Sequence, residues 1–113
     1  MSDCIFCKIG AGEIPAKLLY QDNDLIAFRD IAPQAPTHIL ICPRKHVVSL
    51  DDATQEDSAW LGRALLLASK LAKDEGLTAG HRTVINNGEG AGQSVSHLHV
   101  HVLGGRDFRW PPG

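Results

Sequence analysis

Ser96-His97-Leu98-His99-Val100-His101-Val102-Leu103 is the stretch that says most about the fold of this chain. Successive side chains of a β-strand point to opposite faces, so the stretch predicts a strand with imidazoles on one face and aliphatic groups on the other. The aliphatic face can pack a sheet against a helix. Histidines two positions apart on a strand lie about 7 Å from each other, close enough to bracket one phosphate or to bind one metal ion. A row of hydrogen-bonded structural histidines is the alternative interpretation.

A glycine-rich loop, Asn87-Gly88-Glu89-Gly90-Ala91-Gly92-Gln93, directly precedes this stretch. Glycines let peptide N–H groups approach an anion closely, and the hydroxyl of Ser94 adds a further donor. Most such loops are only turns, but one joined to a row of histidines favours phosphate. A neutral imidazole is a competent nucleophile at phosphorus near pH 7, and a neighbouring imidazolium can stabilise negative charge. The sequence has no Walker-type lysine loop and no acidic cluster for Mg²⁺, so we expect chemistry that needs no metal.

The rest of the chain predicts four more strands and one long helix. Short apolar runs predict strands over 18–20, 25–28, 37–42 and 82–86, before the histidine strand over 95–103. Thr54, with Asp57 three residues later, resembles a capping box, and it opens an apolar pattern of helical spacing that ends near Gly76. A short turn or helix is expected at the N-terminus. Because neighbouring strands have short links, we expect an α+β fold, an antiparallel five-stranded meander with the long helix on one face.

Composition and length exclude several classes of protein. The 113 residues fit a single domain over 1–113, and the net charge of −2 argues against a broad face for nucleic acid. No run approaches the roughly 20 apolar residues that span a bilayer, and the start of the chain lacks the layout of a signal peptide. We therefore expect a cytoplasmic protein with no membrane and no nucleic-acid partner. An odd cysteine count (Cys4, Cys7 and Cys42) argues against a disulfide scaffold.

Five segments in this order resemble the histidine triad (HIT) family, and specifically its Hint branch of nucleoside phosphoramidases, over nearly the whole chain. They are Gly12-Glu13-Ile14-Pro15-Ala16-Lys17, Asp30-Ile31-Ala32-Pro33-Gln34-Ala35-Pro36-Thr37-His38, Gly92-Gln93-Ser94-Val95, His97-Leu98-His99-Val100-His101-Val102-Leu103 and Trp110-Pro111-Pro112-Gly113. The resemblance implies a HIT-like fold and a homodimer in which two five-stranded sheets join into one continuous sheet of ten strands.

The resemblance also implies the roles of individual residues. His99 would be the nucleophile that takes the nucleotidyl group, His101 would bind and polarise the phosphate, and His97 and His38 would orient them. Nucleotide contacts would come from Phe28 and Ile31 at the base, Asp30 at the ribose, Asn86, Gly92, Gln93 and Ser94 at phosphate or ribose, and Trp110 near the partner's site. Arg29 and Ser96 depart from the pattern, because some relatives carry a histidine and an aromatic residue there.

The implied reaction is hydrolysis of the P–N bond of a purine nucleoside 5′-phosphoramidate. His99 attacks the α-phosphorus and expels an amine, and water then hydrolyses the nucleotidyl-histidine to a nucleoside monophosphate such as AMP or GMP. No cofactor is required for this catalysis.

Cys4 and Cys7 have the spacing of half a zinc site, and the expected remaining donors are His46 and His97. Some bacterial HIT proteins resemble this arrangement and carry a structural zinc there. The alternative interpretation is that both cysteines are small apolar residues, packed with their neighbours Ile5, Phe6 and Ile9.

Three other functions remain open at the level of sequence. One is a dinucleoside polyphosphate hydrolase of the same family, and another is a non-enzymatic nucleotide-binding dimer that regulates protein partners. The third is a metalloenzyme in which His97, His99 and a third residue hold catalytic zinc, and which a chelator would inactivate. The presence of His101 and of the tail 110–113 resembles the phosphoramidases more than the transferases and polyphosphate hydrolases.

Overall fold

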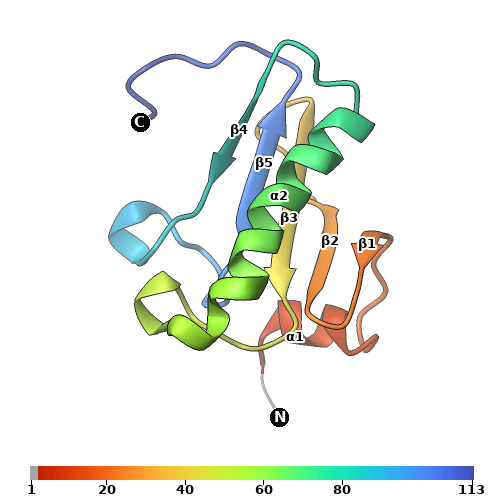
Figure 1. The fold of residues 1–113 in the computed structure, drawn as a ribbon, viewed down its shortest axis with the longest axis vertical. Helices are drawn as coiled ribbons and strands as arrows, with labels where there is room; N and C mark the ends of the chain where they lie inside the picture. Colours follow the sequence, from red (N-terminus) through yellow and green to blue (C-terminus); the bar gives the residue numbers. More distant parts are fainter. Residues whose placement is uncertain (1–2) are drawn as a thin grey trace.

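A five-stranded antiparallel sheet with a long helix across one face forms the body of the protein (Figure 1). The computed structural model describes residues 3–113. Its strands are β1 Leu18–Gln21, β2 Leu25–Arg29, β3 Thr37–Pro43, β4 His81–Val84 and β5 Val100–Gly104, and its helices are α1 Ile5–Gly10 and α2 Ser58–Asp74. The predicted α+β class, five-stranded sheet and long helix are confirmed. Within the described residues, neither helix is long and apolar enough to cross a membrane.

The strand order is β1-β2-β3-β5-β4, so the sheet is a simple meander only over its first three strands. The chain leaves β3, crosses one face of the sheet as α2, and returns as β4 at the edge. β5 then enters between β3 and β4 and pairs antiparallel with both. Burial explains this order, since Val100 and Val102 of β5 are 1% and 0% exposed, whereas β4 has exposed residues and suits an edge.

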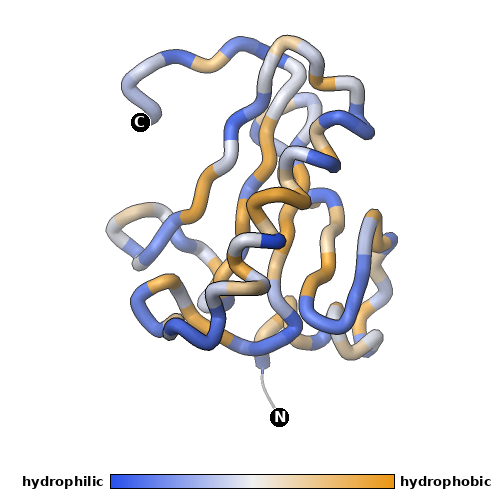
Figure 2. Tube along the Cα trace, viewed as in Figure 1, coloured by the Kyte–Doolittle hydropathy of each residue, from blue (hydrophilic) through white to orange (hydrophobic). Residues whose placement is uncertain are grey.

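Alternation along β2 and β3 buries both faces of the sheet. Leu25 and Ile39 belong to the cluster under α2, whereas Ile26 and Leu40, one position on, pack with Phe6 of α1 on the opposite face. Figure 2 shows hydrophobic residues concentrated along the central strands and the helix above them. Cys42 is also fully buried, as an apolar strand residue would be, and burial raises the pKa of its thiol.

The predicted capping box opens a short 3-10 helix, Gln55–Asp57, rather than α2 itself; α2 follows directly and ends before Gly76. The N–H of Thr54 donates to the Asp57 carboxylate at 2.9 Å, and Gly76 takes a φ of +76°, which glycine adopts without strain. Leu65, which the helical pattern places on the packed face, is 49% exposed, and the next residue, Leu66, is 74% exposed. The buried residues of α2 therefore lie beside these two leucines, and the two leucines face away from the sheet of their own chain.

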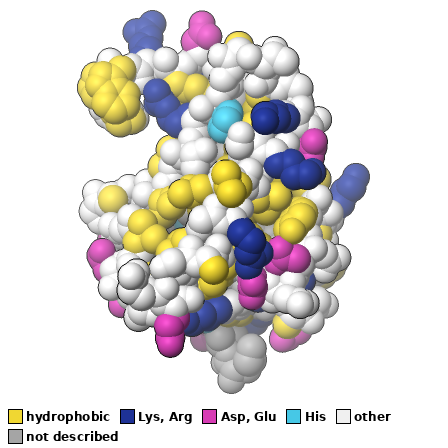
Figure 3. Space-filling model, in the orientation of Figure 1, with side chains coloured by type: hydrophobic (Ala, Val, Ile, Leu, Met, Phe, Trp, Pro, Cys, Tyr) yellow, Lys and Arg dark blue, Asp and Glu magenta, His cyan; other side chains and the backbone are white. Residues whose placement is uncertain are grey.

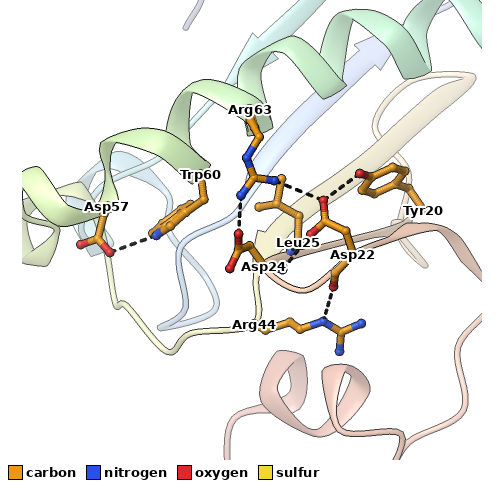
Figure 4. Close-up of polar contacts among 8 residues, drawn as sticks. All are labelled: Tyr20, Asp22, Asp24, Leu25, Arg44, Asp57, Trp60 and Arg63. Carbon is orange, nitrogen blue, oxygen red and sulfur yellow. Dashed lines mark hydrogen bonds and ion pairs between the residues drawn. The ribbon is translucent and has the colours of Figure 1, made fainter.

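A polar network ties the β1–β2 hairpin to α2 (Figure 4) and, through Arg44, to α1. Asp22 in the hairpin turn accepts a hydrogen bond from the Tyr20 hydroxyl at 2.7 Å and pairs with Arg63 of α2. Arg44, directly after β3, donates to the backbone carbonyl of Asp22 and to that of Gly10, both at 2.7 Å. Since Gly10 ends α1, this network holds α1 on the face of the sheet that carries the histidines.

Candidate active site

The histidine stretch is only partly a strand, which corrects the predicted strand over 95–103. β5 begins at Val100, and His97 and His99 lie in an irregular segment just before it. The ladder with β3 stops where Ile41 faces Val100, because β3 ends at Pro43, which has no N–H to donate. The predicted alternation still holds, since the aliphatic side chains at 98, 100 and 102 are buried in the α2 cluster.

His99 is a buried imidazole whose orientation is fixed. It is 4% exposed, and its Nδ1 lies 2.7 Å from the backbone carbonyl oxygen of His97. A carbonyl only accepts, so Nδ1–H of His99 donates, and the lone pair of the neutral ring is on Nε2. The ring of Phe6 packs edge-on against it, with centroids 5.2 Å apart. These contacts fix the direction of the Nε2 lone pair, and a lone pair of this kind can serve as a nucleophile.

His101 lies beside His99, with ring centroids 4.8 Å apart. Its Nδ1 is 2.9 Å from Nε2 of His38, a histidine of β3 that is itself buried. Its other nitrogen, Nε2, is buried and has no hydrogen-bond partner among the described residues. Because such a group normally has a partner, this nitrogen marks the place where a ligand atom would bind.

Burial keeps the two paired histidines neutral at pH 7. It lowers the pKa of His101 to about 4, helped by His99 and His38 and opposed by Asp30. It also lowers the pKa of His38, and there Asp30 again acts in the opposite direction. The imidazolium expected from the sequence is therefore absent from this pair until a negatively charged ligand favours it.

We expect the folded state to lose stability as the pH falls from 7 toward 4. The unfolded chain binds protons at His38 and His101 below about pH 6.5, whereas the folded state resists them, so acid favours unfolding. Urea unfolding at pH 7 and 5.5 measures the loss in wild type and in His101→Gln, which has one buried imidazole fewer and should depend less on pH. The explanation is wrong if both proteins respond equally. The Asp57 carboxylate does not interfere at pH 7 and 5.5, since both its ordinary pKa of 3.8 and its pKa in the folded protein, which Lys45 lowers to about 2, lie below this range.

A cavity of about 500 Å³ opens beside the two histidines. His99, His101 and Ser94 form its polar end, and α1, β2 and the segment between α1 and β1 form its apolar wall. Six predicted site residues line it together: Phe28, Asp30, Ile31, Ser94, His99 and His101. A polar end beside an apolar wall suits a molecule with one anionic group and one flat ring.

Several lining residues were not predicted from the sequence. Ile5, Phe6 and Ile9 of α1 belong to the wall of the cavity, as do Ile14 to Lys17 and Leu19. The helical spacing of Ile5 and Ile9 indicates an apolar face, but no sequence signal shows that this face lies beside the histidines.

Four of the predicted nucleotide-binding residues do not line this cavity: Asn86, Gly92, Gln93 and Trp110. The side chain of Gln93 holds its own loop, since its Nε2 donates to the carbonyl of Val48 at 2.6 Å and its Oε1 accepts from the N–H of Gly88 at 2.8 Å. Trp110 lies on the C-terminal tail and is 83% exposed. Arg29 is among the residues that line the cavity, but its guanidinium forms two 2.9 Å contacts with Glu75.

The structure brings together the four residues predicted to bind zinc. The ligand atoms of Cys4, Cys7, His46 and His97 all lie within 4.8 Å of one another. The sulfur-to-Nδ1 distances are 3.2 Å for Cys4–His97 and 3.3 Å for Cys7–His46, near the roughly 3.5 Å that tetrahedral zinc imposes on such a pair.

The orientation of His97 also fits a metal ligand. Its Nε2–H donates to the Pro43 carbonyl at 2.7 Å, which leaves a lone pair on Nδ1 facing the sulfurs. These residues therefore fit structural zinc. The other donor group in the described part of the chain consists of Asp30, His38 and His101, and it does not include His99.

Comparisons with known proteins agree with this geometry. The model of the HIT domain family matches residues 11–108. An uncharacterized HIT-like protein of Synechococcus elongatus is 54% identical over 98% of this chain and 97% of its own. A HIT family hydrolase from Legionella pneumophila is 52% identical, with a TM-score of 0.94 over 98% of this chain and all of that one. A histidine triad protein from Clostridium difficile is 41% identical, with a TM-score of 0.90 over 96% of both chains.

Proposed function

The chain belongs to the HIT domain family, and on that basis we propose that it is a hydrolase of the Hint branch that cleaves purine nucleoside 5′-phosphoramidates. One observation carries the proposal: the ring of His99, with its lone pair on Nε2, lies beside the ring of His101, whose Nε2 is unpartnered, at the polar end of an apolar cavity. A HIT protein of 52% identity that is named a hydrolase supports it.

In the first step, the lone pair of His99 Nε2 forms a bond to the α-phosphorus. The P–N bond to the amine breaks, its electron pair leaves with the amine, and the amine takes up a proton from water. The imidazole of the nucleotidyl-histidine carries positive charge, which the Nδ1–H bond to the His97 carbonyl stabilises. His101 donates to a non-bridging oxygen of the phosphate, where charge develops in the transition state.

In the second step, water attacks the same phosphorus and loses a proton to the solvent. The bond from phosphorus to His99 Nε2 breaks, and its electron pair returns to the ring. The products are a nucleoside monophosphate and the original enzyme. Two similar displacements at one phosphorus need one nucleophile and one oxyanion donor, which this site supplies without a metal at the reacting atoms.

The cavity wall supports a purine as the base. Phe28 and Ile31 offer flat and aliphatic surface next to Asp30, and a purine ring gains from burial against both. Asp30 accepts a hydrogen bond from the N–H of Ala32 through Oδ1, and its other oxygen is available to the ribose hydroxyls.

A substrate panel tests this proposal. Wild-type protein is expected to hydrolyse adenosine and guanosine phosphoramidates faster than dinucleoside polyphosphates, as measured by kcat/KM. A preference for polyphosphates would replace the proposed branch with the polyphosphate hydrolases. Nucleotide binding without hydrolysis of any member of the panel would favour the non-enzymatic regulatory dimer.

We also propose that the chain forms a homodimer through β4 and α2. β4 pairs with β5 on one side only, so its outer edge has unpaired N–H and C=O groups that the β4 of a second copy could pair with. The exposed Leu65 and Leu66 would add apolar contact area, and Figure 3 shows hydrophobic side chains gathered over α2 and beside it. The C-terminal tail extends past the β4 edge (Figure 1), which would carry Trp110 to the partner.

Solution mass tests the homodimer. Sedimentation is expected to give twice the 12.2 kDa mass of the chain, and Leu66→Asp is expected to shift the mass toward the monomer, because a charge replaces buried apolar area. Leu50→Asp, at a less exposed leucine away from α2, is the control. A monomeric wild type would contradict the proposal.

We further propose that Cys4, Cys7, His46 and His97 hold a structural zinc ion. Zinc would supply no chemistry at phosphorus, but it would fix the start of α1 to His97. His97 carries the carbonyl that orients His99, so the metal site and the nucleophile share one residue.

A further inference from the structure

The His38–His101 pair is anchored at its far end by a peptide group. The backbone N–H of Gln34 donates to Nδ1 of His38 at 3.0 Å. A peptide nitrogen only donates, so Nδ1 of His38 has the lone pair and the hydrogen of the neutral ring is on Nε2. His38 donates this hydrogen to Nδ1 of His101 at 2.9 Å. The hydrogen of neutral His101 is therefore on its buried, unpartnered Nε2.

We propose that the peptide N–H of Gln34 is a positioning group that makes His101 a hydrogen-bond donor to the phosphate. This inference rests on the proposed function and names a part of that site outside the histidine triad. Phosphate oxygens only accept, so the site binds them when Nε2 of His101 carries hydrogen. If both rings took the opposite tautomer, the lone pair of His101 Nε2 would face the phosphate and repel it.

Asp30 acts on the same pair more weakly. Its Oδ2 lies 3.5 Å from Nε2 of His38, which is too far for a normal hydrogen bond, although its charge still favours a hydrogen on that nitrogen. Without the Gln34 N–H, we therefore expect a mixture of tautomers rather than a complete reversal.

The chain after β5 holds Gln34 in place. Nη2 and Nε of Arg106 lie 3.2 and 3.4 Å from the carbonyl oxygen of Gln34. Gly105 has a φ of +91° and packs closely on Pro36, because a Cβ added to Gly105 would lie 2.8 Å from the Cβ of Pro36. The guanidinium of Arg106 also stacks on Phe108, 4.3 Å from the ring centroid. Gly105 and Arg106 thus hold the loop that presents the N–H to His38.

Two variants of Gln34 separate the peptide N–H from the side chain. Gln34→Pro removes the N–H, whereas Gln34→Ala keeps it and removes only the side chain, which bonds to the Ala32 carbonyl. Nitrogen NMR of the histidine rings in ligand-free protein distinguishes N–H from lone-pair nitrogens. We expect His101 to carry hydrogen on Nε2 in wild type and Gln34→Ala, and to populate both tautomers in Gln34→Pro. The kcat for phosphoramidate is expected to fall about tenfold in Gln34→Pro alone, because the donor is mispositioned.

A second pair of variants tests the support from the tail. Arg82 and Arg106 both stack on Phe108, but only Arg106 contacts Gln34. Arg106→Ala is expected to mix the tautomers of His101, and Arg82→Ala is not. Equal spectra for Gln34→Pro and Gln34→Ala would overturn the inference. The spectra need no substrate. If Gln34→Pro mixes the tautomers as expected while wild-type protein hydrolyses no phosphoramidate, the proposed function is refuted and the control of the His101 tautomer by the Gln34 N–H stands.

Discussion

Replacing His99 with alanine is expected to lower kcat for adenosine phosphoramidate by about 10⁴-fold or more, because the covalent route loses its nucleophile. Water would then have to attack the phosphorus directly, at a position where the wild-type protein has the imidazole of His99. The expected KM changes little, since Phe28, Ile31 and His101 still line the cavity. Steady-state kinetics measures both parameters.

Trapping the nucleotidyl-histidine intermediate tests the same prediction by direct chemical analysis. Rapid quenching of wild type with substrate should yield protein heavier by one nucleotidyl group, attached within the peptide that contains His99. His81→Ala is the control, because His81 is exposed and lines no part of the catalytic cavity. Near-normal turnover in His99→Ala, or nucleotidyl label on another residue, would assign the chemistry elsewhere.

Removing zinc is expected to produce the second large effect, on stability rather than on the chemical step. We expect about one zinc ion per chain by elemental analysis, and a fall in Tm of about 5 °C or more when a chelator removes it. The sheet and α2 have their own apolar core, so the apo protein should remain folded. Loss of the metal would loosen α1, and kcat would fall by a smaller factor as His99 loses its fixed orientation.

Cysteine variants separate the metal site from ordinary burial. Cys4→Ala and Cys7→Ala should each lose zinc and the Tm response to chelator. Cys42→Ala should keep both, although it also lowers Tm, because Cys42 is a buried strand residue and no part of the donor group. Protein without stoichiometric zinc, together with a Tm that chelator leaves unchanged, would favour the interpretation of Cys4 and Cys7 as apolar packing residues.

Local pattern was sufficient where one interaction within a few residues decides the structure. The capping box of Thr54 and Asp57 marks the start of the helical region, and the left-handed conformation of Gly76 marks its end. Both depend only on residues that are close in the sequence. The sequence pattern was insufficient to predict the ends of a strand, because a strand extends only as far as the adjacent strand can pair with it. The sequence 95–103 alternates throughout, yet only the part that faces a hydrogen-bonding partner on β3 becomes β5.

The candidate site shows the same division. Motifs indicated side chains of distinctive chemistry, such as His99, His101 and Asp30, as candidates, and all three line one cavity. Gln93 has a polar side chain in the right motif, but three hydrogen bonds to its own surroundings occupy that side chain. Gln34 acts through a peptide N–H, a group that every residue except proline has, so no residue pattern could indicate it.

The sequence by itself determined the aliphatic and imidazole faces of the histidine stretch, the long helix, and the candidate residues for attacking or binding a phosphate. It could do so because side-chain period and side-chain chemistry are local properties. Only the tertiary structure decided that β5 lies between β3 and β4, that α1 forms part of the cavity wall, and which nitrogen of His38, His99 and His101 carries hydrogen. Such features depend on contacts such as Gln34–His38, His97–His99 and Cys7–His46. These partners come within hydrogen-bonding distance only when the backbone has folded.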